Sequence, residues 1–211
     1  MIVVFLGPPG VGKGTQAKLL AEKLGIPQIA TGDVLRAAVR EGTPPGLAAK
    51  AAMDRGDLVP DDVILGIMKE ALASPAAARG AIIDGVVRTV PQGEGLARAL
   101  SGLGRPLDAV LMFEAPHEEL VRRLSGRTVC ETCQTPHTGR EPGSRCDKCG
   151  GRLVRRQDDE PDAVRNRLDV YARQTAPVVD WYRRNGLPCR IIDAVGTTDE
   201  VFGRVLTALP R

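Results

Sequence analysis

A glycine-rich loop directly behind the first apolar segment restricts the fold more than any other feature. Residues 2–6 read IVVFL, residues 7–15 read GPPGVGKGT, and a helical pattern runs over residues 15–24. Glycines let consecutive backbone N–H groups turn inward around phosphate oxygens, the following helix adds its dipole, and Lys13 reaches the outer phosphates. An ordinary glycine-rich turn needs neither the lysine nor Thr15. The sequence therefore predicts a phosphate-binding loop, with Gly14 separating the lysine from the threonine hydroxyl.

Short apolar segments alternate with helical patterns along most of the chain. We expect strands at 2–6, 26–30, 81–84, 109–113 and 189–193, and helices at 15–24, 33–40, 61–72, 91–100, 118–124 and 162–185. Strands that are almost wholly apolar are typical of a parallel sheet covered on both faces. The alternation predicts an α/β fold with a doubly wound parallel sheet of five strands.

Composition and charge narrow the class of protein. The 211 residues are 43% hydrophobic and 26% charged, which excludes a disordered tail protein, and no apolar run reaches membrane-spanning length. The net charge of +3 does not suggest non-specific nucleic-acid binding. However, residues 120–173 hold 11 of the 23 arginines, which indicates a local anionic partner.

Four of the five cysteines form two pairs: Cys130-x-x-Cys133, twelve intervening residues, and Cys146-x-x-Cys149. This spacing is typical of a structural tetrahedral zinc site, with iron or redox-active thiols as the alternatives. Residues 127–155 have no long helical period and depend on the metal to order them. His137 is an unnecessary ligand, and Cys189 is expected to be a buried core thiol.

The cysteine pairs also bear on location. Paired Cys-x-x-Cys motifs indicate metal binding in a reducing compartment rather than a disulfide framework. The first apolar run is too short for a signal peptide and lacks a basic flank. We therefore expect a cytoplasmic protein.

Asp84 ends the apolar run of residues 81–84 and precedes Gly85. An acidic residue at the carboxyl end of a parallel strand beside a phosphate-binding loop commonly holds Mg²⁺ through water molecules. A turn or helix-capping role is the alternative. The sequence thus predicts a magnesium site at Asp84.

Almost the whole chain resembles the adenylate kinase family of P-loop nucleoside-monophosphate kinases, in its bacterial form with a long, zinc-bearing lid. The motifs that carry the resemblance, in order, are residues 7–15, TGDVLR at 31–36, GDLVP at 56–60, DG and RT at 84–89, Gln92, GR at 126–127, and RQDD at 156–159 running to RNRL at 165–168. The resemblance implies a P-loop NTPase core at 1–29, 60–126 and 160–211. It also implies a helical AMP-binding insertion at 30–59 and a zinc-binding lid at 127–159.

The resemblance further implies the residues of each site. ATP would be held by Gly10, Val11, Gly12, Lys13, Gly14, Thr15, Arg123, Arg127 and Gly196. AMP would be held by Thr31, Gly32, Arg36, Asp57, Leu58, Val59, Gly85, Arg88, Gln92, Arg156 and Arg167. The catalytic set would be Lys13, Arg88, Arg123, Arg127, Arg156 and Arg167. The implied reaction is the reversible Mg²⁺-dependent conversion of ATP and AMP to two ADP.

Physical chemistry supports these roles independently. The phosphate of AMP is largely ionised at neutral pH, so it needs no general base, and the chain has only two histidines. The reaction instead requires compensation of negative charge spread over several phosphates, which arginines and Mg²⁺ supply. Arg122, Arg155 and Arg165 are expected to be solvated surface residues instead.

The sequence departs from the family in two places. Val86-Val87 stand where most members have Phe-Pro, and Pro136-His137 where zinc-bearing members have Tyr-His. A UMP/CMP-type kinase is the alternative within the enzyme class, and a zinc-ribbon nucleic-acid-binding protein is the alternative outside it. The low aromatic content of 3% speaks against the latter. We expect a monomer that binds ATP, AMP and ADP, and neither nucleic acid nor a membrane.

Overall fold

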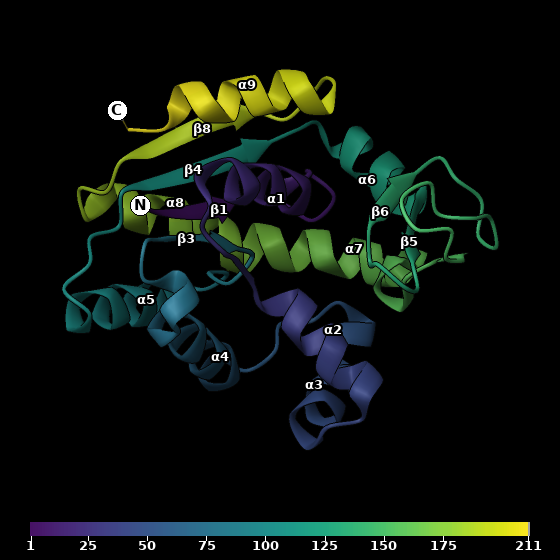
Figure 1. Ribbon diagram of the computed structural model, residues 1–211, viewed down its shortest axis with the longest axis horizontal. Coiled ribbons are helices and arrows are strands. Elements are labelled where there is room, and N and C mark those ends of the chain that lie inside the picture. The colour runs from purple at the N-terminus through teal and green to yellow at the C-terminus, as the bar shows by residue number, and fades with distance from the viewer. Residues whose placement is uncertain (211) are drawn as a thin grey trace.

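A parallel sheet of five strands forms the centre of the computed structural model, which describes residues 1–210 apart from the side chain of Pro45 (Figure 1). The strand order is β2-β3-β1-β4-β8, and every neighbouring pair is parallel. The strands are β1 (Ile2–Leu6), β2 (Gln28–Ala30), β3 (Ala81–Asp84), β4 (Ala109–Glu114) and β8 (Cys189–Asp193). This confirms the predicted α/β fold.

Helices cover both faces of the sheet, as a doubly wound fold requires. One core cluster draws on α4 (Asp61–Ala73), α5 (Val90–Gly102) and α8 (Ala176–Arg184). The other draws on α1 (Lys13–Leu24), α6 (His117–Ser125), α7 (Pro161–Val170) and α9 (Thr198–Ala208). None of the helices within residues 1–210 combines the length and apolar character needed to cross a membrane.

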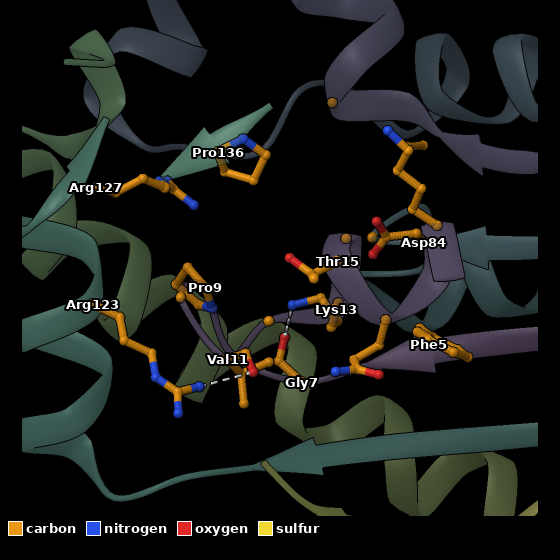
Figure 2. Close-up of a pocket in the computed structure, with 18 of the residues that line it drawn as sticks. Phe5, Gly7, Pro9, Val11, Lys13, Thr15, Asp84, Arg123, Arg127 and Pro136 are labelled. Atoms are coloured by element: carbon orange, nitrogen blue, oxygen red, sulfur yellow. Dashed lines mark hydrogen bonds between the residues drawn. The ribbon is translucent and has the colours of Figure 1, made fainter. Parts of the chain in front are cut away.

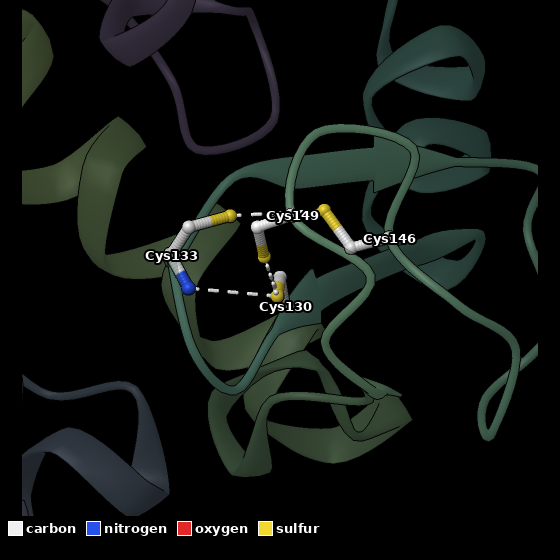
Figure 3. A group of neighbouring side chains, drawn as sticks. All are labelled: Cys130, Cys133, Cys146 and Cys149. Atoms are coloured by element: carbon white, nitrogen blue, oxygen red, sulfur yellow. Dashed lines mark hydrogen bonds between the residues drawn. The ribbon is translucent and has the colours of Figure 1, made fainter.

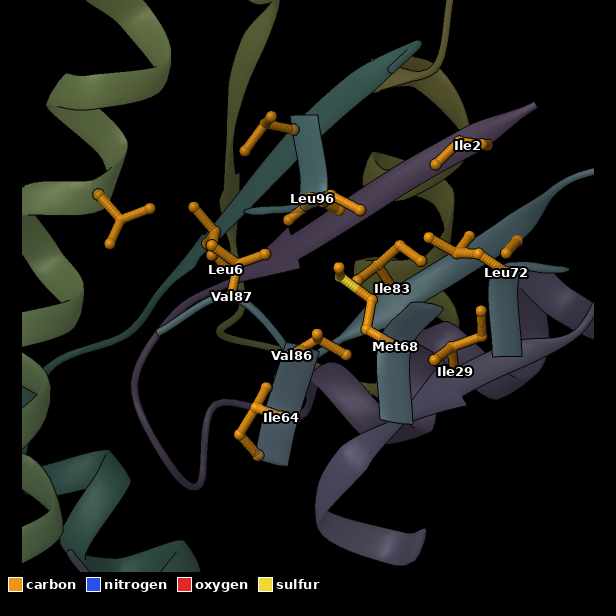
Figure 4. Packing of buried hydrophobic residues seen from close by; sticks show 14 of the residues in the cluster. Ile2, Leu6, Ile29, Ile64, Met68, Leu72, Ile83, Val86, Val87 and Leu96 are labelled. Atoms are coloured by element: carbon orange, nitrogen blue, oxygen red, sulfur yellow. The ribbon is translucent and has the colours of Figure 1, made fainter. Parts of the chain in front are cut away.

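The central strand β1 explains why the two clusters stay separate. Side chains alternate across a strand, so Ile2, Val4 and Leu6 face the first cluster while Val3 and Phe5 face the second. Figure 4 shows Ile2 and Leu6 packed in the first cluster. All five are at most 2% exposed. Burial of this apolar strand on both sides fixes the starting point of the glycine-rich loop that follows Leu6.

The last strand differs from the expectation of burial on both faces. β8 lies at an edge of the sheet, and Ile191 is 57% exposed. Cys189 is only partly buried and packs at the margin of the first cluster, so the expectation of a fully buried thiol was wrong. An edge strand has a neighbour on one side only, which leaves part of its surface to solvent.

The long helix expected at 162–185 is divided. α7 gives way to a π-helical turn, η3 (Tyr171–Thr175), before α8 begins. Pro177 has no N–H to donate to a carbonyl four residues earlier, which accounts for a break in the regular α-helical bonding at this point.

Two further parts stand away from the sheet (Figure 1). α2 (Thr31–Glu41) and α3 (Pro44–Arg55) form a helical pair. β5 (Arg127–Cys130), β6 (Pro136–Thr138) and β7 (Leu153–Val154) form an antiparallel sheet with the order β6-β5-β7. Short 3₁₀ turns lie at η1 (Pro75–Ala77) and η2 (Gln157–Asp159). Residues 127–155 are free of helix as expected, but their small sheet was not foreseen.

Candidate active site

A cavity of about 1070 Å³ lies beyond the carboxyl ends of β1 and β3 (Figure 2). Its lining comes from the glycine-rich loop, α2, the loop after β3, α6, the antiparallel sheet and α7. Ligands of open parallel sheets bind at this edge. The volume is at the upper end of the range for small-molecule sites, which suits more than one ligand at a time.

The glycine-rich loop wraps around the start of α1. Gly7 has a φ of +142°, and a Cβ there would lie 2.6 Å from the carbonyl oxygen of Phe113 in β4. Gly12 caps the helix in the left-handed region, with a φ of +100°. Both positions therefore require glycine. The amine of Lys13 donates to the carbonyls of Gly7 at 2.7 Å and Pro8 at 2.9 Å (Figure 2).

Lys13 and Asp84 form the electrostatic centre of the cavity floor. Burial lowers the pKa of Lys13 to about 7, although Asp84 works against this shift. Burial raises the pKa of Asp84, opposed by Lys13 and by a 2.9 Å hydrogen bond from Gln28. Neighbouring groups do not fully compensate the charge of the Lys13 ammonium or of the Asp84 carboxylate. The pair therefore favours a ligand that brings negative charge to Lys13 and a cation to Asp84.

The arginines expected to bind phosphates converge on the same cavity. The group comprises Arg36, Arg88, Arg123, Arg127, Arg156 and Arg167, all of which line it. Burial, with Arg167 and Arg36 nearby, lowers the pKa of Arg88 to about 10, and burial lowers that of Arg156 to about 10. The Nε of Arg156 is buried without a hydrogen-bond partner. Such a concentration of positive charge around one cavity calls for a polyanion.

Arg123 is held by two segments that line the cavity, the glycine-rich loop and the residues after β8. Its Nε donates to Glu119 at 2.6 Å, and its two terminal nitrogens donate to the carbonyls of Val11 at 3.3 Å and Ala194 at 3.0 Å. Glu119 was not singled out from the sequence, although its spacing of four residues from Arg123 on one helix is a recognisable ion-pair signal. The guanidinium therefore sits against the glycine-rich loop.

Asp159 is a second residue that the sequence reasoning did not assign. Its side chain is fully buried and accepts hydrogen bonds from Arg127 Nε at 2.7 Å and Arg167 Nη1 at 2.9 Å. One carboxylate thus orients two arginines from separate elements, β5 and α7. The acidic pair shortly after Arg156 in the sequence is the signal from which this role could have been predicted.

Most of the expected site residues line the cavity, and four do not. Residues 10–15, Gly32, Leu58, Asp84, Gly85 and Gly196 line it, together with the arginines. Thr31, Val59 and Gln92 are buried beside it, at 2%, 7% and 1% exposure. Asp57 instead accepts from Asn166 at 2.7 Å and Arg55 at 2.9 Å. Arg122, Arg155 and Arg165 are largely exposed as expected, although Arg122 also reaches the rim of the cavity.

The four cysteines lie together beside the antiparallel sheet, Cys130 at the end of β5 and the other three in loops (Figure 3). Their sulfur atoms lie within 4.8 Å of one another, with Cys130 and Cys149 3.4 Å apart and Cys133 and Cys146 3.7 Å apart. A tetrahedral ion at roughly 2.3 Å from each sulfur requires separations of about 3.8 Å, whereas a disulfide requires about 2 Å. The cluster therefore fits a four-coordinate metal ion, and none of these four cysteines forms a disulfide with another.

β6 faces both the cavity and the cysteine cluster. Pro136 and Thr138 line the cavity, whereas Nε2 of His137 lies 3.4 Å from Sγ of Cys146. Alternation along the strand explains this division. His137 therefore contacts the cluster from outside the set of four sulfurs.

Comparison with known proteins identifies the relatives of the chain. The family model described as "Adenylate kinase" matches residues 5–187. An adenylate kinase of Gemmatimonas aurantiaca is 66% identical over 211 residues, which cover 99% of each chain. Adenylate kinases of Syntrophotalea carbinolica and Methanosarcina barkeri are 48% and 47% identical, and each match covers at least 98% of both chains.

Proposed function

This chain belongs to the adenylate kinase family and is a nucleoside-monophosphate kinase, and from that premise we propose how its residues carry the transfer of a phosphoryl group between ATP and AMP. The observation that carries the proposal is the meeting of Lys13 with five arginines that line one cavity: Arg88, Arg123, Arg127, Arg156 and Arg167. Phosphoryl transfer needs positioned positive charge more than covalent chemistry.

The two nucleotides are assigned to opposite ends of the cavity. ATP phosphates lie on residues 10–15 with Arg123, and the backbone near Gly196 borders the adenine. AMP lies between α2 and the loop after β3, with Arg36 and Arg88 on its phosphate. Arg127, Arg156 and Arg167 lie over the phosphoryl group in transit. The convergence of these groups, each lining the same cavity, supports the assignment.

Asp84 is proposed to hold Mg²⁺ through water. Its carboxylate lies at the carboxyl end of β3, and a Cβ on Gly14 would be 3.4 Å from its Oδ2, so it borders the start of α1. Mg²⁺ bound there neutralises phosphate charge and holds phosphate oxygens in place. Asp84, acting through Mg²⁺, and Lys13, acting directly, would thus hold the same phosphates.

The cysteine cluster is proposed to hold structural zinc. Four thiolates complete a tetrahedral shell, which leaves no position for a substrate. Cys130 and Cys146 are buried together with Leu153 in a small cluster of this region, and Cys133 packs against them partly buried. The metal would therefore supply ordering energy to residues 127–159, the proposed lid.

The proposed organisation has three parts: the core at 1–29, 60–126 and 160–211, the AMP-binding insertion at 30–59, and the lid. The protein is proposed to act as a monomer, and light scattering after gel filtration tests this. Thiols used as metal ligands support a cytoplasmic location.

Coupled steady-state assays test the activity directly. ATP and AMP should give two ADP only with Mg²⁺ present. Turnover with AMP as the acceptor should exceed turnover with GMP, CMP or UMP. Preference for UMP or CMP would contradict the proposal and assign the UMP/CMP-type reaction instead.

A further inference from the structure

The main chain of Arg88 is held from both sides. Its N–H donates to Oε1 of Gln92 at 2.7 Å, and its carbonyl accepts from the hydroxyl of Thr175 at 2.9 Å. Thr175 is 6% exposed and Gln92 is 1% exposed. We call this pair of hydrogen bonds the Arg88 clamp. Water cannot readily replace bonds in such buried positions.

The π-helical turn provides one half of the clamp. Thr175 is the last residue of η3, at the point where the helix breaks before Pro177. A threonine in a regular helix commonly bonds a carbonyl of its own preceding turn. Here its hydroxyl bonds to Arg88, 87 residues earlier in the chain. The irregular turn therefore ties the long helix to the loop after β3, and π-turns of this kind are frequent at functional sites.

Asp61 orients Gln92, the other residue of the clamp. It is the first residue of α4 and accepts from Nε2 of Gln92 at 2.7 Å and from the hydroxyl of Thr89 at 3.2 Å. A carboxylate can only accept hydrogen bonds, so it fixes the amide nitrogen of Gln92 toward itself. The amide oxygen must then face the N–H of Arg88.

Arg88 needs such support because of its surroundings. It lies in the loop between β3 and α5, with no regular structure of its own. Arg36 and Arg167 are close enough to repel it. Its side chain has one internal bond of 2.8 Å, from Nε to the carbonyl of Gly85. A displaced main chain would move the guanidinium away from a bound phosphate, and small displacements are costly in sites of this kind.

We propose that Thr175 and Asp61 are positioning residues for the acceptor nucleotide, acting through the main chain of Arg88. The inference rests on the proposed function of Arg88 as a ligand of the AMP phosphate. Gln92 links Asp61 to Arg88, because its amide oxygen accepts from Arg88 while its amide nitrogen donates to Asp61.

Thr175→Val tests the clamp, because valine keeps the shape and removes the hydroxyl. We expect the KM for AMP to rise about threefold to tenfold, the range for one lost buried hydrogen bond, with the KM for ATP within about twofold of wild type. Thr175→Ser should restore the wild-type KM for AMP. Thr207→Val is the matched control, since the Thr207 hydroxyl bonds the carbonyl of Gly203 in α9, away from the cavity.

A KM for AMP in Thr175→Val equal to that in Thr207→Val would overturn the proposal, as would equal rises for both nucleotides. If Thr175→Val does not fold, Asp61→Asn decides by the same measurement. Arg88→Ala distinguishes a failure of the Arg88 clamp from a failure of the proposed AMP site. A rise in its KM for AMP without any effect of Thr175→Val refutes the clamp alone, whereas an unchanged KM in Arg88→Ala refutes the proposed AMP site itself.

Discussion

Nζ of Lys13 lies 2.7 Å from the carbonyl oxygen of Gly7, inside the loop whose ligand it is proposed to bind. The amine is buried and bonded to its own loop while the backbone of that loop is held open by glycines. A bound phosphate would draw the amine toward its oxygens. This relationship leads to the first two predictions.

Lys13→Met should lower kcat by about 100-fold or more and leave the fold intact, because the ammonium compensates charge that grows as the phosphoryl group moves. Coupled assays and thermal melts measure the two effects. Lys23→Met, on the same helix but outside the cavity, is the control. More than a small fraction of wild-type kcat in a folded Lys13→Met protein would refute the catalytic role.

Binding of ATP should take up protons at about pH 8.5. The pKa of Lys13 is about 7 in the folded chain, against an ordinary value of 10.5, so the unfolded chain binds more protons between these values. The contribution of this lysine to the free energy of unfolding therefore rises with pH across that interval in the free protein. Phosphate charge reverses the shift and returns a proton to the amine.

Calorimetry in two buffers with different ionisation enthalpies measures this proton uptake. The uptake should be positive in wild type and much smaller in Lys13→Met. Equal uptake in both proteins would assign the proton to another group.

Asp159→Asn should destabilise the free protein by about 3 kcal/mol or more, because it leaves Arg127 and Arg167 without their shared carboxylate. Bound nucleotides supply negative charge to the same arginines, so the loss should shrink when ATP and AMP are present. Urea unfolding with and without nucleotides measures both values. Asp180→Asn removes the partner of an exposed arginine and should cost less than about 1 kcal/mol.

The purified protein should contain one zinc per chain by elemental analysis. Cys130→Ser/Cys133→Ser should lose the metal and melt at a lower temperature, while circular dichroism still reports the α/β core. Cys189→Ser, outside the cluster, should keep the zinc. Complete unfolding of the core on zinc removal would contradict a lid that is ordered separately from the sheet.

The positions of the strands could be predicted because each is a short apolar run, but their places in the sheet could not. Arg190, a charged residue within 189–193, is a signal of an exposed strand that was not used, so the exposure of Ile191 was missed. The π-turn at 171–175 depends on how Pro177 is accommodated by neighbouring elements. Periodicity alone predicts a continuous helix there.

Site residues were predictable where a motif names a chemical group that faces the ligand. Lys13, Asp84 and the arginines were found in this way, and all line the cavity. Residues that support others carry no such signature. Asp159 and Thr175 contact arginines far away in the sequence, which only the folded arrangement brings together. Glu119 was missed although its spacing from Arg123 on one helix could have indicated the ion pair.

The crowding of positive charge around the cavity links the lifetime of this protein to the supply of its substrates. Desolvation, and after it the neighbouring cations, disfavour the charged forms of Arg88, Arg156 and Arg167, a cost that a folded chain without ligand bears continuously. Nucleotides bind only the folded state and shift the balance toward it. A cell depleted of adenine nucleotides would then expose more of this protein to proteolysis, and digestion rates across a range of ATP and AMP concentrations measure that dependence.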